Sequence, residues 1–529
     1  MELEAISEAA IEQNLEQFLL VLAVSLAVAT LSRLVPWLRK IPYTLLLVIA
    51  GSILAFLEVR LVNLSPELIL QIFLPPLLFE AAWNIRWPNL RKNFATVSLF
   101  AVVGVIISVL GIGWAVTTLT GLPLAIALLL GASLSATDPV SVVALFRELG
   151  ASKRLTILME GESLFNDGVA VVAFSLLVGI PLGLEEFSLS ATLARFRVFV
   201  GVGVGVGSLI GFGISYLTQR FDLPLVEQSL TLVAAYGTYL ATERLGGSGV
   251  IGVVTVGIIL GNFGSRIGMN PRTRLIVSEF WEFIAFFVNS IVFLLIGDQV
   301  NVTSLGGNLP LIGITIAAVV VTRAIAIYGL GGISNAAFRA DINWGNLTVL
   351  WWGGLRGSVS IALALSLPVV LPGREAVIET VFGVVLFTLL VQGLTIRPLL
   401  DGLNLVGDRP IRQKYAEAIA RQVALTRVRT YLEETSNFPT VDLEYVRYQR
   451  ELVDVQLGQL EREIERLQVE HEQLAEYDME QLNTQLLDIE AKTYAEFIQA
   501  GRLDEELSPL LQEILLEAEE IPAGQVASS

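Results

Sequence analysis

The 529-residue sequence contains no cysteine, a single histidine and few charged residues. The lack of cysteine excludes disulfides, thiolate metal sites and cysteine nucleophiles. Charged residues make up 16% of the chain, whereas soluble domains average about 25%, and 54% of the residues are hydrophobic. No Gly-x-x-x-x-Gly-Lys-Ser/Thr loop is present, so neither ATP nor another cofactor is implied. This composition predicts a polytopic membrane protein embedded in a lipid bilayer.

The net charge of −17 comes largely from the residues after about 405. It argues against nucleic acid as a partner, because a nucleic-acid-binding protein would carry a basic face. The segment 1–17 is acidic and lacks the basic region of a cleaved signal peptide. We therefore expect the first hydrophobic helix to remain in the protein.

Hydropathy predicts an all-α membrane domain of thirteen spans within residues 1–404. The spans cover residues 15–36, 41–58, 66–82, 94–119, 122–146, 154–180, 192–219, 226–243, 248–263, 275–298, 309–333, 345–370 and 375–400. Lysine and arginine are concentrated in alternate loops, which places these loops in the cytoplasm. The N-terminus is then outside a cell membrane and the C-terminal tail is cytoplasmic.

Residues 405–529 are predicted to form an acidic helical tail whose partner is unknown. Apolar residues from Val453 to Leu474 follow an alternating 4-3 spacing. This pattern predicts either a short coiled coil over 453–474 or an amphipathic helix packed on its neighbours. His471 falls on the same seam, where it is either a pH sensor or an ordinary polar seam residue.

The motif Thr137-Asp138-Pro139 lies within the span 122–146. Pro139 has no N–H, and its ring clashes with the carbonyl of the residue four positions earlier. Asp138, the residue before it, is pushed out of the α conformation. Backbone broken in this way inside a membrane lines a cavity or is buried in protein, and its freed carbonyls can coordinate a cation. The motif predicts an interrupted helix at a cation site, or alternatively a structural kink capped by Asp138.

The motif Gly161-Glu162-Ser163-Leu164-Phe165-Asn166-Asp167-Gly168 places two carboxylates in the apolar span 154–180. A charge at bilayer depth costs on the order of 2–3 kcal/mol and therefore indicates a functional site. Ser163 and Asp167 share a helix face because they are four residues apart. They offer a hydroxyl and a carboxylate as hard oxygen ligands for Na⁺.

Glu162 points about 100° away from Ser163 along the helix and needs a partner of its own. Arg323 and Arg356 are the candidates, because both lie in apolar spans where an unpaired arginine would be untenable. We interpret Glu162–Arg356 as the structural pair and Asp167 as the group that takes part in exchange. Glu80 follows a double proline near the cytoplasmic end of its span, as an interfacial anchor or as a ligand reached from the cytoplasm.

Three separated motifs resemble the signatures of the monovalent cation/proton antiporter-1 family, which contains the NhaP-type Na⁺/H⁺ antiporters and the animal Na⁺/H⁺ exchangers. They are Ala136-Thr137-Asp138-Pro139-Val140, the motif 162–168, and Gly353-Gly354-Leu355-Arg356-Gly357. The resemblance covers about residues 15–400. It implies inverted repeats, two interrupted crossing helices and a homodimer. It also implies core helices at about 94–180 and 309–400, and dimerisation helices at about 15–82 and 192–298.

The resemblance further implies roles for individual residues. The implied cation-binding set is Glu80, Thr137 through its backbone carbonyl, Asp138, Ser163 and Asp167. The implied structural ion pair joins Glu162 to Arg356. Asn166 occupies the position that distinguishes Asn-Asp members, generally electroneutral, from Asp-Asp members, generally electrogenic.

The implied function is secondary antiport of Na⁺, with Li⁺ or K⁺ as other candidates, against H⁺, in pH homeostasis and salt tolerance. The cation and the proton compete for Asp167, and the core helices move so that the site opens to alternate sides. The alternatives are a K⁺/H⁺ or Ca²⁺/H⁺ antiporter, a cation channel or uniporter using the same acids, a Na⁺-coupled symporter of an organic anion, and a sensor with vestigial transport. A membrane enzyme fits the sequence least.

Overall fold

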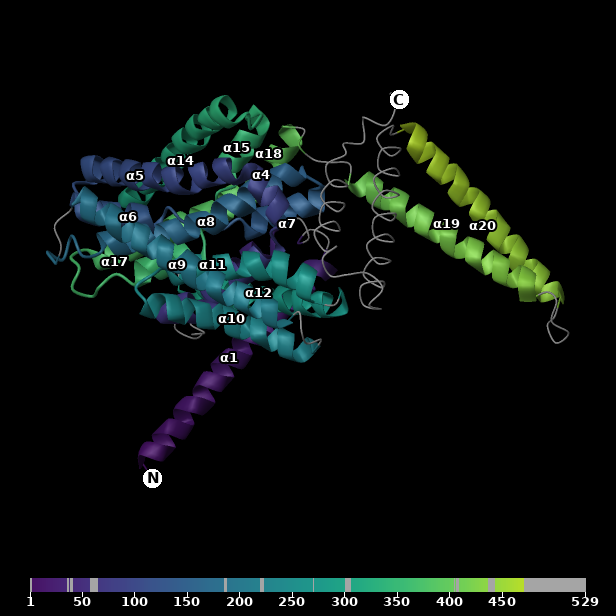
Figure 1. The fold of residues 1–529 in the computed structure, drawn as a ribbon, viewed down its shortest axis with the longest axis horizontal. Coiled ribbons are helices and arrows are strands. Elements are labelled where there is room, and N and C mark those ends of the chain that lie inside the picture. The colour runs from purple at the N-terminus through teal and green to yellow at the C-terminus, as the bar shows by residue number, and fades with distance from the viewer. Residues whose placement is uncertain are drawn as a thin grey trace. The chain divides into compact units, whose positions relative to one another are not determined.

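The computed structural model describes residues 2–35, 38, 41–57, 65–184, 188–218, 223–269, 271–299, 306–403, 405, 409–435 and 443–470. These residues form helices and connecting segments without a β-strand (Figure 1). The chain divides into two compact units, Met1–Val406 and Gly407–Ser529. The first unit contains the apolar helices and the second contains the charged ones.

One group of helices in the first unit comes from two separate stretches of chain and is held together by direct packing. α2 packs on α12, α9 packs on α11, and α3 packs on both α11 and α12. Its members are α1 (Glu2–Leu34), α2 (Tyr43–Phe56), η2 (Leu68–Phe73), α3 (Leu74–Asn84), α9 (Leu189–Thr218), α10 (Pro224–Arg244), α11 (Gly249–Ile259), η4 (Leu260–Gly268) and α12 (Pro271–Asp298). We call it the first helix group.

The second helix group interleaves the other two stretches, and in it α5 packs between α6 and α14. Its members are α4 (Trp87–Ser98), η3 (Leu99–Val103), α5 (Gly104–Thr120), α6 (Leu124–Ser133), α7 (Val140–Leu149), α8 (Lys153–Leu177), η5 (Gly306–Asn308), α14 (Leu309–Phe338), α15 (Trp344–Trp352), α16 (Ser358–Leu365), α17 (Arg374–Phe387), η6 (Thr388–Gln392) and α18 (Gly393–Gly402). α8 lies between the two groups, since it contacts α4 and α6 on one side and α3 and α11 on the other (Figure 1).

The apolar composition of these helices is that of a multi-pass membrane protein. The described parts of the expected spans overlap helices, some of them divided into consecutive segments, and the number of spans stays a prediction. Within the described residues, six helices are both long and apolar enough to cross a membrane: 16–34, 87–120, 189–218, 273–298, 306–338 and 374–402. Large apolar side chains face outwards, as Leu209 of α9 does with 77% of its surface exposed. Such exposure suits a lipid environment rather than water.

Two of the expected spans are interrupted in the middle. α6 ends at Ser133 and α7 begins at Val140, so residues 134–139 leave the helix around Pro139. α15 ends at Trp352 and α16 begins at Ser358, and the glycine-rich segment 353–357 joins them. The prediction of an interrupted helix at Asp138 is therefore confirmed.

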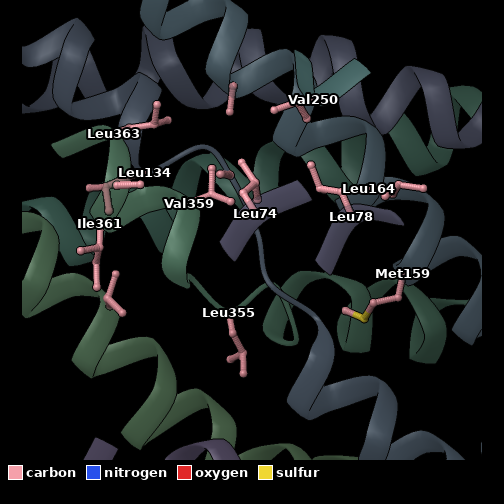
Figure 2. Close-up of a cluster of buried hydrophobic side chains, with 14 of the residues drawn as sticks. Leu74, Leu78, Leu134, Met159, Leu164, Val250, Leu355, Val359, Ile361 and Leu363 are labelled. Carbon is pink, nitrogen blue, oxygen red and sulfur yellow. The ribbon is translucent and has the colours of Figure 1, made fainter. Parts of the chain in front are cut away.

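Apolar side chains pack closely around both interruptions. Figure 2 shows Leu134, from the end of α6, near Val359 of α16 and Leu74 of α3, all of which are buried. Such packing excludes lipid and water from the broken backbone, so its polar groups must be satisfied by the protein itself.

The second unit contains α19 (Arg409–Thr435) and α20 (Leu443–Glu470), which pack along one another. Tyr415, near the start of α19, is buried against Leu467, near the end of α20. Arg450 Nη2 lies 2.8 Å from Glu433 Oε1 at the other end, so the two helices run antiparallel. The 4-3 seam of α20 therefore packs on a neighbouring helix of the same chain over its described part, whereas His471 and Leu474 lie outside the described residues.

Candidate functional site

The broken backbone between α6 and α7 is satisfied by side chains from other helices. Arg356 Nη1 donates to the carbonyl oxygens of Ser135 and Ala136, both at 2.9 Å. The Ser163 hydroxyl of α8 donates to the carbonyl oxygen of Thr137 through a short hydrogen bond. A buried carbonyl without a partner is unfavourable, so these contacts stabilise the extended segment where it lies.

Asp138 connects this interruption to the one between α15 and α16. Its backbone N–H donates to the Leu355 carbonyl at 2.8 Å. Its Oδ1 accepts from the backbone N–H of Val140 at 3.1 Å, so the side chain also caps the first turn of α7. Capping was the alternative reading of the Thr137-Asp138-Pro139 motif, and the structure shows that this capping accompanies the interruption.

Two glycines of the segment 353–357 are required by close contacts. A Cβ atom at Gly354 would collide with the guanidinium group of Arg323, and one at Gly357 would collide with the Asp138 carboxylate. Since each position admits only a hydrogen atom, the glycines let two charged groups approach the backbone of the second interruption.

We expect Gly357→Ala to displace the Asp138 carboxylate and to lower the rate of cation-dependent proton movement by about tenfold or more, in line with the cost of overpacking of about 1–3 kcal/mol. Rates in liposomes containing the purified protein would measure the effect. Gly332→Ala is the matched control, because a Cβ atom at that position of α14 meets no atom within 4 Å. Equal rates for the two variants would contradict the role given to Gly357.

The second motif of the sequence lies on α8 and faces the first interruption. Asn166 Nδ2 donates to Thr137 Oγ1 at 3.2 Å and to Glu162 Oε1 at 3.1 Å. Asp167 is buried, and its Oδ1 has no hydrogen-bond partner among the described residues. Its charged neighbours are Asp138, Glu162 and Arg356. The structure thus brings the two predicted acids, Asp138 and Asp167, together with Thr137 and Ser163.

The partner of Glu162 differs from the prediction. Arg323 of α14 donates to both carboxylate oxygens of Glu162, from Nη1 to Oε1 at 3.2 Å and from Nη2 to Oε2 at 3.1 Å. Arg356, which we had paired with Glu162, instead donates to the backbone carbonyls of α6–α7. Arg323 forms the planar, two-bond arrangement that guanidinium and carboxylate groups favour. Arg356 is held instead by its hydrogen bonds to the backbone carbonyls between α6 and α7.

Glu80 belongs to a different set of charges. Its Oε1 accepts from Asn84 Nδ2 at 2.5 Å, and its charged neighbours are Arg147, Glu160 and Glu282. Arg147 Nη2 of α7 in turn lies 2.7 Å from Glu160 Oε1 of α8. The structure does not include Glu80 among the charged neighbours of Asp167.

Two residues near these groups were not recognised from sequence: Glu160, which belongs to the charge group of Glu80 and Arg147, and Thr388, which contacts Arg356. Glu160 lies three residues before Ser163 and seven before Asp167, so helical spacing was a usable signal for it. Thr388 Oγ1 accepts from the backbone N–H of Arg356 at 3.0 Å. The sequence offered no indication of this contact, except that Thr388 is a polar residue in an apolar span.

The assembled groups are of the kinds that can coordinate a hard cation. They are oxygen atoms of a carboxylate, a hydroxyl and a backbone carbonyl, which hard cations prefer. Within the described residues, no group of three or more histidine, cysteine or acidic side chains is arranged to hold a metal ion.

Comparison with known proteins finds relatives that are named Na⁺/H⁺ antiporters. The sequence is 65% identical over 519 residues to the Na⁺/H⁺ antiporter ApNhaP of Aphanothece halophytica, covering 97% of this chain and 99% of that protein. It is 61% identical over 515 residues to the low-affinity Na⁺/H⁺ antiporter NhaS1 of Synechocystis sp., covering 97% of each. The fold matches the solved structure of the sodium proton antiporter MjNhaP1 from Methanocaldococcus jannaschii with a TM-score of 0.60 and 19% identity, covering 74% of this chain and 99% of that one.

The family described as "Sodium/hydrogen exchanger, transmembrane" matches residues 22–402. The resemblance seen in the three sequence motifs is thereby confirmed. The chain belongs to the sodium/hydrogen exchanger family and is a transporter rather than an enzyme.

Proposed function

We propose that this protein exchanges Na⁺ for H⁺ one for one, and that Asp167 carries each of them in turn. The observation behind the proposal is the buried Asp167 Oδ1, which has no partner among the described residues and lies on the same helix face as Ser163. A buried carboxylate is strongly unfavourable while it is charged and unpaired. It is therefore ready to bind a proton or a cation, but not both.

The other proposed cation ligands are the Ser163 hydroxyl oxygen and the Thr137 carbonyl oxygen, which are joined by a hydrogen bond. When Na⁺ enters, the hydroxyl hydrogen rotates away, and both oxygen atoms become available as ligands beside Asp167. When a proton binds instead, the hydroxyl returns to the carbonyl. Neither state leaves the broken backbone unsatisfied.

Asp138 and Arg356 set the electrostatics of this exchange. Asp138 supplies a second negative charge near Asp167, and Arg356 supplies a compensating positive charge. Glu80 lies with Arg147 and Glu160 in a separate group, so we place it on the approach from the cytoplasm.

The larger architecture belongs to the same proposal. We propose thirteen spans with inverted repeats, an outside N-terminus and a cytoplasmic tail in the cell membrane. The second helix group acts as the moving core, and the first helix group forms the homodimer. The interleaving of chain segments in both groups and the likeness to a solved antiporter fold support this arrangement.

The function is tested in liposomes that have an acidic interior and contain a pH-sensitive dye. Addition of Na⁺ outside is expected to make the interior alkaline, and separate additions of Li⁺, K⁺ and Ca²⁺ establish selectivity. If no cation dissipates the proton gradient, the proposed function is wrong. Alkalinisation by Ca²⁺ alone would replace it with divalent exchange.

We expect exchange to be electroneutral, because Asn166 next to Asp167 leaves one exchangeable carboxylate in the pair. Clamping the membrane potential of the liposomes at different values with K⁺ and valinomycin should leave the initial rate of Na⁺-driven alkalinisation unchanged. Liposomes without protein correct for passive leak. A rate that rises or falls steeply with the potential would rule out one-for-one stoichiometry.

Removal of the residues after Leu405 should leave a folded transporter. The first compact unit ends at residue 406, and α19 and α20 of the second unit pack on one another. Size-exclusion chromatography and the liposome assay would compare the shortened and full-length chains. An aggregated or inactive shortened chain would show that the tail is needed for the membrane part to fold or work.

A further inference from the structure

The last apolar helix contains a turn of π-helix at η6, between α17 and α18. Such turns are rare in helices and are frequent at functional sites. Thr388 begins η6 and Gln392 ends it, and both are buried. Because they are four residues apart, both side chains face the same direction.

That direction is towards the interruption between α15 and α16. Thr388 Oγ1 accepts from the backbone N–H of Arg356 at 3.0 Å. At the next residue after Gln392, a Cβ atom added to Gly393 would meet Leu355 Cδ1 at 3.7 Å. η6 therefore packs against Leu355 and Arg356.

Two buried polar atoms in this region have no hydrogen-bond partner among the described residues. One is Gln392 Oε1, which only accepts, and the other is Arg356 Nε, which only donates. Leaving either atom unsatisfied is unfavourable in a membrane interior. Asp167 Oδ1 is a second unsatisfied acceptor, and Arg356 is among its charged neighbours.

We propose that Gln392 is a positioning residue of the transport site, which binds the guanidinium of Arg356 when Asp167 is loaded. In the empty site the charged Asp167 attracts Arg356 and so competes with the incoming Na⁺. Gln392 offers Arg356 another acceptor and thereby releases Asp167 for the cation. Arg356 thus alternates between a carboxylate and an amide. This inference rests on the assignment of Asp167 as the exchange site.

Gln392→Met tests this role because methionine keeps the length of the side chain and removes the acceptor. We expect the KM for Na⁺ in the liposome assay to rise about three- to tenfold, the range of one hydrogen bond, with Vmax changed less than about twofold. Val391→Met is the matched control, since Val391 is the preceding residue and is 41% exposed. Its KM should equal that of the unmodified protein.

Gln392→Glu provides the second variant and keeps an acceptor for Arg356. Its KM is expected to be equal to or below that of the unmodified protein. A reduced Vmax with unchanged KM in Gln392→Met, or a raised KM in Gln392→Glu, would overturn the proposal in favour of a structural role.

Na⁺-dependent thermal stabilisation in detergent gives an independent measure of cation binding. Gln392→Met should need about three- to tenfold more Na⁺ for the same stabilisation, and an unchanged requirement counts against the proposal. If Asp167→Asn still exchanges Na⁺ for protons, the site assignment itself fails. If that variant is inactive while Gln392→Met behaves normally, only the role of Gln392 is wrong.

Discussion

We expect Asp167→Asn to abolish Na⁺-driven alkalinisation in liposomes. The substitution preserves the shape of the side chain but removes both the negative charge that attracts Na⁺ and the group that binds the proton. Because the site has no histidine or cysteine to replace it, we expect the rate to fall to that of liposomes without protein. The initial rate of dye recovery after addition of Na⁺ measures this directly.

The same variant should remain folded, which separates loss of exchange from loss of structure. Burial of a charged carboxylate is unfavourable, so an amide at residue 167 should leave thermal stability equal or higher. Glu279→Gln is the matched control, because it removes an exposed carboxylate from α12. Proton movement that persists in Asp167→Asn with the same Na⁺ dependence would exclude the proposed mechanism.

Breaking the Glu162–Arg323 pair should have the largest effect on stability. Arg323→Met leaves the Glu162 carboxylate buried without its cation, which typically lowers the free energy of unfolding by about 3–5 kcal/mol. The double variant Glu162→Gln/Arg323→Met removes both charges and should recover most of this loss. Thermal unfolding in detergent, followed by tryptophan fluorescence, compares the single and double variants.

Arg356 supplies the control for that comparison. Arg356→Met removes the Nη1 donation to the Ser135 carbonyl and leaves the Ala136 carbonyl with only the weak donation from Ser360 Oγ at 3.5 Å, a defect that removal of the Glu162 charge cannot repair. Glu162→Gln should therefore rescue Arg323→Met but not Arg356→Met. The reverse pattern would mean that Arg356 is the structural partner of Glu162 after all.

The sequence was sufficient to predict the interruption and the proximity of Thr137, Asp138, Ser163 and Asp167 around it. A proline within an apolar run, such as Pro139, disfavours a continuous helix, and a carboxylate beside it in that span has few structural explanations. The choice between Arg323 and Arg356 depended on how α14 and α15 pack. Local sequence patterns do not give the distance from either guanidinium group to Glu162. Both the residue-level interpretation and the family resemblance favoured Arg356, whereas the structure pairs Glu162 with Arg323, the other candidate.

The fold was also predictable in part: the positions of the helices were predictable, but their local irregularities and some of their packing were not. Long apolar runs determined where the helices lie, because only a helix satisfies its own backbone in lipid. The π-helical turns such as η6 were not foreseen, since one additional residue in a turn has no signature in hydropathy. The tail was left between two arrangements because a 4-3 seam does not reveal whether its partner is another chain or α19.

The hydrogen bond from Asp138 to Leu355 has a mechanical consequence for the second helix group. We expect the two interrupted segments to move together. Separating them would break the Asp138–Leu355 hydrogen bond and leave a backbone N–H and a carbonyl without a partner at a depth where water is absent. Labels attached to α7 and α16 should therefore keep a constant separation throughout turnover. Separations measured from either label to α10 should alternate between two values, because we expect the second helix group to move as a rigid body relative to the first.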